Sequence, residues 1–371
     1  MDFDYTHEQR ELQAQARRFL EERCPPARVR RALEVTDGAP DRVLFEAIAG
    51  LGWLGVAVPE SAGGVGLGHV ELCALAEELG RALLPGPFAS SVYFFAEALR
   101  IAGSDAQRSR WLPQVASGAA TGCAAFFEGA GELDATGRAA RVEGGRLRGT
   151  KQPVPDGMAA DACVVLAEDA HGPGLFLAAL GAGSVERTPL HAFDGSRPLA
   201  RLRFDGVAVE RLGGAGEGLV LAQRVLERAA VPIAFEQLGA ADRCLEMARD
   251  YALQRRAFGR PIGGFQAVKH RLADVYVRNE LARSNAYYAA WALANDAPEL
   301  GAAAAAARIA ATEAAEFAAR ENIQVHGGIA ITWEADPHLF LRRARHCAAV
   351  AGGADWWSER LAAGLAAGQG I

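Results

Sequence analysis

The spacing of apolar residues gives the first part of the chain a helical period. Leu72, Leu75 and Leu79 recur at i, i+3 and i+7, which predicts a helix with one buried stripe. Asp41 is a suitable N-cap for a further helix over the run VLFEAIAG. Residues 1–115 are therefore expected to form a helical domain.

Residues 116–213 lose that period, and short alternating or continuous apolar runs replace it. A hairpin turn leading into a strand is predicted by EGGRLRGTK, and buried strands by ACVVLA and GLFLAAL. The run ARLRFDGVAV alternates at Leu202, Phe204 and Val207, with a turn expected at the Asp-Gly pair in its middle. Sparse charge and frequent glycine favour a small β-sandwich or barrel in this zone.

Residues 214–371 return to a helical period. Phe265, Val268, Leu272 and Val275 mark one amphipathic helix, and a tract of high helix propensity follows in GAAAAAARIAATEAAEFAARE. The order of an all-α, an all-β and a second all-α zone predicts an α+β multidomain fold. We expect the two helical zones to share a core, with the β module inserted between them.

Composition narrows the class of protein. Half of the 371 residues are hydrophobic and 23% are charged, which is typical of a globular chain. A net charge of −6 gives no electrostatic footprint for nucleic acid or an anionic membrane. No run approaches the roughly 18 apolar residues of a membrane span, and the acidic, polar N-terminus is unlike a signal peptide. A cytoplasmic enzyme, or a subunit of one, is the expectation.

Cysteine and histidine spacing gives no sign of a disulfide framework or a metal site. The six cysteines are far apart and form no C-x-x-C pair, so we interpret them as reduced core residues. His338 and His346 have no carboxylate at ligand spacing. No metal is expected.

A glycine-rich run, PESAGGVGLG, invites a dinucleotide-binding interpretation. Its glycines are not preceded by the alternating or β-branched strand that such a fingerprint requires. A surface loop is therefore the expectation for this run.

Two segments carry candidate chemistry. The first, residues 251–275, reads YALQRRAFGRPIGGFQAVKHRLADV and places Arg255 and Arg256 just before Phe258 and Gly259. One interpretation is a solvated basic cluster at the turn between two helices. The other is an anion site, where an arginine fork and a helix N-terminus meet a pyrophosphate.

The second segment, residues 322–345, reads NIQVHGGIAITWEADPHLFLRRAR. Gly327 and Gly328 are expected to end a long helix and to let the backbone approach a ligand closely. Gln324 offers an amide to a flat polar ring. His326, beside the two glycines, is expected to pack or cap rather than to catalyse.

Together these segments resemble the acyl-CoA dehydrogenase family, and the resemblance extends along nearly the whole chain. The most specific internal signature of the family looks like RRAFGRPIGGFQAVKHRLAD, and its second like QVHGGIAITWE. The family opens with a stretch like DFDYTHEQRELQAQARRFL and continues with stretches like LGWLGVAVPESAGGVGLG and EELGRALLPGPF, in the same order. A bacterial branch found in degradation clusters is similar at WEADPHLFLRRA.

The resemblance implies a helical N-terminal domain, a small central β domain and a C-terminal domain like a four-helix bundle. It also implies an oligomer of dimers, with FAD bound across each dimer interface. Arg255 and Phe258 would hold the ADP half of the FAD that belongs to the neighbouring subunit, and Gln266 would reach the same cofactor. Contacts on its pyrophosphate side would come from Gln324, Gly327 and Gly328.

The implied reaction is the α,β-dehydrogenation of an acyl-CoA thioester. In it, a carboxylate removes the α proton while hydride passes from Cβ to flavin N5. An electron-transferring flavoprotein would then reoxidise the flavin. The degradation-type branch points by analogy to bulky, cyclic or steroid-like acyl groups.

The commonest base of the family, a glutamate in a Glu-Gly-Thr-like turn, has no counterpart in this chain. Counting on from Glu334 without gaps puts Ala351 in its place, followed by Gly352 and Gly353. Alanine accepts no proton. A minority of the family instead places the base on the helix before the R-x-x-F-G signature.

Counting back from Gly239 puts Ala229 in that minority position. Two residues earlier stand Glu227 and Arg228, which look like the minority's Glu-Arg pair if the preceding loop is longer by two. Glu236 lies in the apolar run AAVPIAFEQLGAA, where a carboxylate is either paired with an arginine or functionally perturbed. Glu236 and Glu227 are the two candidate bases, with Glu236 ranked first.

The β zone departs from the family as well. Many members carry tryptophan and threonine two apart on a strand against the flavin, where GTKQPVPDG puts Pro153 and Pro155. Neither proline donates a backbone hydrogen bond or offers a hydroxyl. The upstream flavin segment reads FFEGAGELD, so flavin contacts from this zone would rely on backbone groups.

Two functions are therefore considered. The first is an active FAD-dependent acyl-CoA dehydrogenase with a relocated carboxylate. The second is a non-catalytic or half-site subunit of a hetero-oligomer, which completes the FAD site of a homologous partner.

Overall fold

The computed structural model describes residues 5–35, 37–129, 133, 138–181 and 185–366. The chain forms two compact units. The first, here called the bundle unit, holds Met1–Val29, Val70–Leu84 and Ala230–Ile371. The second, the barrel unit, holds Arg30–His69 and Pro85–Ala229. The bundle unit thus combines parts of both helical zones of the sequence.

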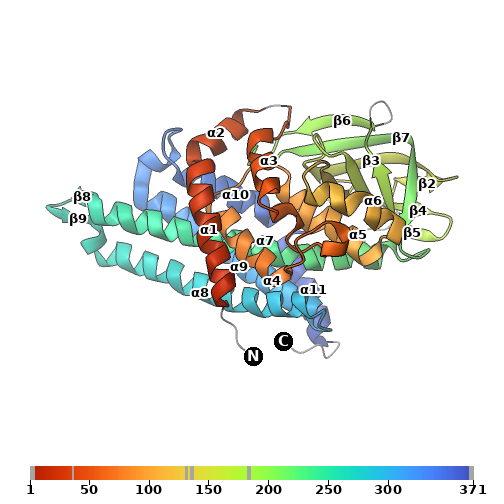
Figure 1. Cartoon of the computed structure of the whole chain (residues 1–371). Coiled ribbons are helices and arrows are strands. Elements are labelled where there is room, and N and C mark those ends of the chain that lie inside the picture. The colour runs from red at the N-terminus through yellow and green to blue at the C-terminus, as the bar shows by residue number, and fades with distance from the viewer. Residues whose placement is uncertain (1–4, 36, 130–132, 134–137, 182–184, 367–371) are drawn as a thin grey trace. The chain divides into compact units, whose positions relative to one another are not determined.

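The element order confirms the predicted α+β fold, with helices before and after one set of strands (Figure 1). The first helical stretch comprises α1 (His7–Arg23), α2 (Pro26–Glu34), α3 (Arg42–Gly50), the short turns η1 (Trp53–Gly55) and η2 (Glu60–Ala62), α4 (His69–Arg81), the π-helix η3 (Ser90–Ala96), α5 (Glu97–Ala102) and α6 (Asp105–Ala116). The strands are β1 (Gly122–Ala125), β2 (Arg141–Glu143), β3 (Arg146–Pro155), β4 (Ala162–Asp169), β5 (Gly172–Ala179), β6 (Val185–Leu190) and β7 (Leu199–Leu212). The second helical stretch comprises α7 (Gly218–Gln254), the strands β8 (Arg256–Ala257) and β9 (Arg260–Pro261), η4 (Ile262–Gly264), α8 (Gln266–Ala294), α9 (Leu300–His326), η5 (Gly327–Ile331), α10 (Pro337–Ala349) and α11 (Ala354–Ala366).

Two early helices form where the sequence predicts them. The Asp41 side chain caps α3 by accepting a hydrogen bond from the Leu44 N–H at 3.1 Å. Leu72, Leu75 and Leu79 of α4 are each 3% exposed or less, so the predicted stripe is buried.

The glycine-rich run, residues 59–68, begins with the short turn η2 and continues as an exposed loop, as expected. A Cβ on Gly64 would lie 2.1 Å from the carbonyl oxygen of Val58, so the loop folds tightly back on itself. The described chain before it, residues 5–35 and 37–58, contains helices and turns but no strand. The dinucleotide-binding arrangement, which needs a strand before the glycines, is therefore not formed.

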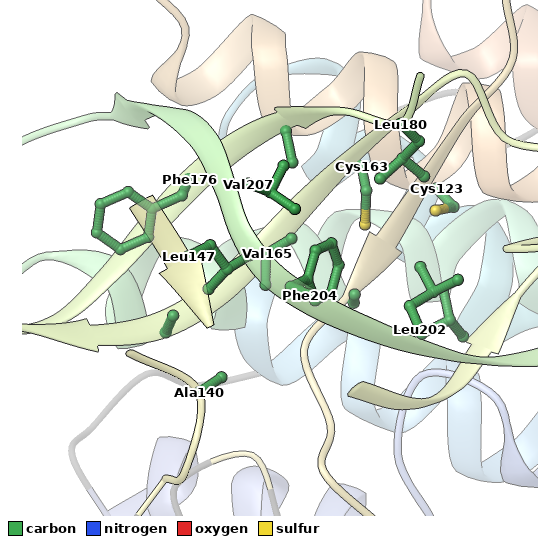
Figure 2. Packing of buried hydrophobic residues seen from close by; sticks show 14 of the residues in the cluster. Cys123, Ala140, Leu147, Cys163, Val165, Phe176, Leu180, Leu202, Phe204 and Val207 are labelled. Carbon is green, nitrogen blue, oxygen red and sulfur yellow. The ribbon is translucent and has the colours of Figure 1, made fainter. Parts of the chain in front are cut away.

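The strands of the barrel unit close into a small barrel. The strand β4 pairs with β5, β5 with β7, β7 with β3 and β3 with β2, and β2 returns to β4 through Arg141 opposite Glu168. β1 runs parallel beside β4, and β6 runs antiparallel beside β7. The predicted hairpin between β2 and β3 turns at Gly144 and Gly145, which both have positive φ. Apolar side chains from these strands fill the interior (Figure 2).

The turn expected within ARLRFDGVAV is wrong, because β7 runs unbroken from Leu199 to Leu212. Gly206, at φ 75°, is instead the extra residue of a β-bulge in the pairing with β3. The extra residue shifts the alternation by one, so Val207 joins Leu202 and Phe204 in the barrel core (Figure 2). An Asp-Gly pair suits a turn and a bulge equally, because both need a residue at positive φ.

In the bundle unit, α7 crosses α4 at two glycines. A Cβ on Gly80 would lie 1.9 Å from the carbonyl oxygen of Glu236, and one on Gly239 would lie 1.8 Å from that of Glu77. Only glycine allows two helix backbones to approach this closely. Elsewhere in the unit α9 packs along α8, and its alanine tract is buried at residues 302–305.

The cysteines confirm the interpretation as reduced core residues, since all six are buried and none forms a disulfide. Within the part of the chain that the structure describes, no group of three or more acidic, cysteine or histidine side chains gathers as metal ligands would. None of the described helices combines the length and the apolar character that crossing a bilayer requires.

Candidate functional site

The first candidate segment forms a short two-stranded hairpin between α7 and α8 (Figure 1). At its tip Phe258 and Gly259 have positive φ values of 50° and 79°. The Ile262 N–H donates to the carbonyl oxygen of Arg255 at 2.8 Å and closes its base. Phe258 is 95% exposed. The Phe258 ring lies edge-on to the Phe265 ring, with centroids 6.2 Å apart, and leaves most of its surface open to another molecule.

The basic side chains of this hairpin differ in what they contact. The guanidinium of Arg260 lies 4.1 Å from the centre of the Phe265 ring, and Arg256 donates to the carbonyl oxygen of Gly259 at 3.4 Å. Arg255 is exposed, and within the described chain its side chain has no hydrogen bond or ion pair. Gln266, the first residue of α8, is exposed as well. Arg255 is thus a cation available to a ligand.

The second candidate segment contains the C-terminal end of α9, where the backbone at the two glycines is not covered by other atoms. Gly327 has φ 68° and ψ −149°, a conformation that is essentially restricted to glycine. Nothing lies within 4 Å of where a Cβ would stand on Gly327 or Gly328. Gln324 is exposed one turn earlier. The end of the long helix is confirmed, and its backbone is open to close approach, as a ligand would need.

Tertiary packing brings the two segments together at one end of the bundle unit. The ring of Tyr251, from the first segment, stacks on the imidazole of His326, from the second, with centroids 4.2 Å apart and planes at 27°. A small apolar cluster surrounds the same contact and contains Ala248, Ala252 and Val325, with Ile262, Val268 and Leu272 packed against it. The six cofactor-binding positions predicted from the sequence therefore come from two helix ends that pack on each other.

His326 is held as a neutral, packed group. Its Nδ1–H donates to the carbonyl oxygen of Asn322 at 2.8 Å, and burial lowers the pKa of the imidazole. These contacts confirm the packing and capping role expected for it.

Glu236 lies inside the bundle unit at the crossing of α4 and α7. It is 1% exposed, and its backbone packs against Gly80. Its neighbour Gln237 accepts a hydrogen bond from Arg308 at 2.7 Å. At 1.5 Å per residue, Glu236 is roughly 27 Å along α7 from the hairpin. The structure therefore does not gather this carboxylate with the two signature segments.

Glu227 is half-buried in the barrel unit, next to a compact charge cluster. Its neighbour Arg228 is 5% exposed and pairs with Glu97, which also contacts His69 at 3.3 Å and Arg100 at 2.6 Å. Burial alone would raise the pKa of Glu97, but the hydrogen bond and charge of His69, with the charges of Arg100 and Arg228, lower it well below its usual range. In the Glu-Arg pair proposed from the sequence, the arginine, Arg228, therefore forms an ion pair with Glu97.

The place of the commonest family base holds no proton acceptor. Ala351 is 4% exposed and has φ 64°. Just before it, Arg308 of α9 donates to the carbonyl oxygens of Cys347 and Val350, at the C-terminal end of α10. Burial lowers the pKa of Arg308 to about 10. The partial negative charge of the helix C-terminus compensates this buried guanidinium.

Pro153 and Pro155 both lie within β3, and the pairing of β3 with β7 shifts just before Val154. Neither proline can donate to a ligand from its backbone, as expected. Residues 130–132 and 134 of the stretch FFEGAGELD lie outside the described residues.

The barrel contains an ion pair that the sequence did not predict. Lys151 is fully buried, and its Nζ donates to the carboxylate of Glu128 at 2.7 Å. Burial lowers the pKa of Lys151, although the hydrogen bond from the ammonium to Glu128 opposes this shift. The same carboxylate accepts the N–H groups of Ala139 at 2.7 Å and Ala140 at 3.2 Å. The available signal was a lysine on the same face of a strand as Leu147, four residues earlier. Arg308, a charged residue within an alanine tract, was a second sequence signal of a buried cation.

Comparisons with known proteins agree with this architecture. Family models described as the N-terminal and C-terminal domains of acyl-CoA dehydrogenase match residues 6–119 and 216–365. Acyl-CoA dehydrogenase FadE27 of Mycobacterium tuberculosis is 33% identical over 99% of this chain and 99% of that protein. Acyl-CoA dehydrogenase FadE34 of the same organism is 38% identical over 88% of this chain, which spans only 42% of FadE34. The solved structure of the ChsE4–ChsE5 complex, also from Mycobacterium tuberculosis, has a TM-score of 0.89 and 32% identity over 99% of both chains.

Proposed function

The chain belongs to the acyl-CoA dehydrogenase family of FAD-dependent oxidoreductases, and we propose that it takes part in the α,β-dehydrogenation of an acyl-CoA thioester. The proposal places the protein in the cytoplasm, with electrons passed to an electron-transferring flavoprotein. The observation that carries it is the packing of the two signature segments on each other at one end of the bundle unit.

The residues at that end fit the ADP half and the pyrophosphate of FAD. In the proposal, the exposed Arg255 and the projecting Phe258 bind the ADP half of the cofactor of a neighbouring subunit, and Gln266 reaches the same molecule. Gly327 and Gly328 leave a space that a Cβ would fill, so their backbone can approach the pyrophosphate closely. Gln324 adds an exposed amide beside them.

FAD, when bound, supplies the flavin that accepts hydride from Cβ of the acyl chain. The protein must then bring a carboxylate to the α carbon and keep water away from it. The proposed bases are Glu236 and Glu227, both on α7. Glu236 is kept from water by the crossing of α4 and α7, whereas Glu227 is half-buried beside Arg228.

A half-site subunit is the second candidate function, and three substitutions favour it. Ala351 holds no proton acceptor where the commonest base would stand, Gly353 stands where the family turn has its threonine, and Pro155 offers no hydroxyl from β3. The hairpin with Arg255 and Phe258 would still complete the FAD site of a homologous partner. The ChsE4–ChsE5 complex contains two proteins by its name, which supports a hetero-oligomer for this chain as well.

The visible flavin spectrum separates these functions. The protein is purified alone and after co-expression with a homologous subunit, and each sample is mixed with a short-chain and a steroid-like acyl-CoA. An active dehydrogenase is expected to be yellow on its own and to bleach with one of these substrates. A protein that is colourless alone and yellow only with its partner would support the half-site subunit. A protein that is colourless in both samples would contradict both functions.

A further inference from the structure

A stacked pair of rings joins the two signature segments. Tyr251 lies in the last turn of α7 and His326 is the last residue of α9, and their ring centroids are 4.2 Å apart. The cluster around them consists of alanine and aliphatic side chains, which impose little orientation on the two helix ends. The rings add a contact of defined geometry.

Each ring belongs to a residue that is directly linked to one cofactor-binding segment. The Arg255 N–H donates to the carbonyl oxygen of Tyr251 at 2.8 Å, so Tyr251 defines the point where α7 gives way to the hairpin. His326 directly precedes Gly327, whose N–H donates to the carbonyl oxygen of Ile323. Movement of one ring against the other would therefore move Arg255 relative to Gly327.

A second contact restrains the imidazole. The Nδ1–H of His326 donates to the carbonyl oxygen of Asn322, which is fully buried one turn earlier in α9. The ring cannot rotate without losing this hydrogen bond or the stack. The exposed backbone that follows, at Gly327 and Gly328, has no packing of its own near the position of a Cβ. The end of α9 therefore sets its orientation, through the Gly327 N–H bond to Ile323 and through His326.

We infer that Tyr251 and His326 are positioning residues, which hold the backbone of Gly327 and Gly328 in register with Arg255 so that both segments bind FAD as one site. The inference rests on the proposed function, since it assumes that these segments contact FAD. The ring pair orders the site before the cofactor arrives, which lowers the entropic cost of binding.

The first test is FAD affinity, measured by fluorescence titration of the deflavinated protein in whichever assembly binds FAD. Tyr251→Ala and His326→Ala are each expected to weaken binding about five- to tenfold, the effect of one aromatic pair. His326→Phe keeps a ring against Tyr251 but loses the hydrogen bond to Asn322, so its loss of affinity is expected to be smaller than that of His326→Ala. His191→Ala, at an exposed histidine outside both segments, is the matched control and should change nothing. Equal losses in His326→Phe and His326→Ala would overturn the inference.

The second test asks whether the rings act as a pair. If they do, the double variant Tyr251→Ala with His326→Ala binds FAD about as well as either single variant. Losses that multiply would show independent roles and would also overturn the inference.

The third test needs no cofactor. In the FAD-free protein, amide hydrogen exchange at residues 327–332 is expected to be about tenfold faster in His326→Ala than in wild type, and to lie between these two in His326→Phe. Equal exchange in all three proteins would contradict the positioning role. Failure of the proposed function would look different: no assembly of the wild-type protein would bind FAD, while the exchange effect would persist.

Discussion

Arg308 of α9 donates a hydrogen bond to the carbonyl oxygen of Val350 at 2.9 Å, although 42 residues separate them in the chain. The guanidinium is 1% exposed and also donates to Gln237 at 2.7 Å. One buried cation therefore connects α7, α9 and the end of α10. It also fixes the backbone just before Ala351, where the commonest base of the family would stand.

Replacing this cation is expected to be strongly destabilising. Arg308→Met leaves the carbonyl oxygens of Cys347 and Val350 without their donor, and should lower the free energy of unfolding by about 3 kcal/mol. Urea denaturation measures the loss. The control is Arg345→Ala, because the Arg345 side chain is 50% exposed in its ion pair with Glu316 and should contribute less than about 1 kcal/mol. Equal effects of both variants would argue against a special role for Arg308.

The identity of the base is tested by removing each candidate carboxylate. Glu236→Gln is expected to lower the rate of flavin bleaching by acyl-CoA about 10²- to 10⁴-fold without releasing the flavin, because the amide cannot accept the α proton. Glu227→Gln is the matched comparison on the same helix. Loss of bleaching in Glu227→Gln alone would transfer the role to Glu227. Unchanged bleaching in both variants would leave the chain without a base on α7.

The charge cluster around Glu97 predicts a pH dependence of stability. The folded-state pKa of Glu97 lies below its ordinary value of 4.5. The stabilisation from its ionised form is therefore present above pH 4.5, and is lost as the pH falls below 4.5 towards the folded-state pKa. Glu97→Gln should cost about 3 kcal/mol at pH 7, because it leaves the buried Arg228 without its carboxylate.

The measurement is urea denaturation of wild type and Glu97→Gln from pH 7 to pH 3. The difference between the two proteins should shrink below pH 4.5, because the glutamate then binds a proton in the unfolded wild type while Glu97 stays ionised in the folded protein. A difference that stays constant across this range would contradict the prediction.

The close crossing of α4 and α7 predicts that Gly80 cannot be enlarged. Gly80→Ala would place a Cβ 1.9 Å from the carbonyl oxygen of Glu236, so the helices must separate, at a cost of about 3 kcal/mol. Thermal or urea unfolding reports the loss. At Gly50, at the end of α3, nothing lies within 4 Å of a Cβ, so Gly50→Ala should change stability by less than about 0.5 kcal/mol.

The bulge in β7 gives a prediction of a different kind. Gly206 has φ 75°, which an alanine adopts at a cost of about 1 kcal/mol, whereas asparagine tolerates it better. Gly206→Ala should therefore lower the free energy of unfolding more than Gly206→Asn. Equal effects would point to crowding rather than to backbone conformation, since a Cβ would meet Arg148 at 3.3 Å.

Local pattern alone predicted much of the fold. The helical stripe of Leu72, Leu75 and Leu79, the cap at Asp41 and the order of helical and β zones all appear as expected. The reason is physical: the period of apolar residues reports which face of an element is buried, and a cap needs only its own first turn. The two signature segments, which carry the family resemblance, could likewise be recognised from short runs of neighbouring residues.

Contacts between distant residues were decided only by the tertiary structure. The sequence could not tell a bulge from a turn at Gly206, because the difference lies in the partner strand β3. It also could not join Tyr251 to His326, or give Arg308 the carbonyl oxygen of Val350, since each partner lies on another helix. The sequence around Glu236 also could not show whether its side chain is buried or exposed to solvent. Its burial follows from the crossing of α4 and α7, where two glycines remove the side chains that would hold the helices apart.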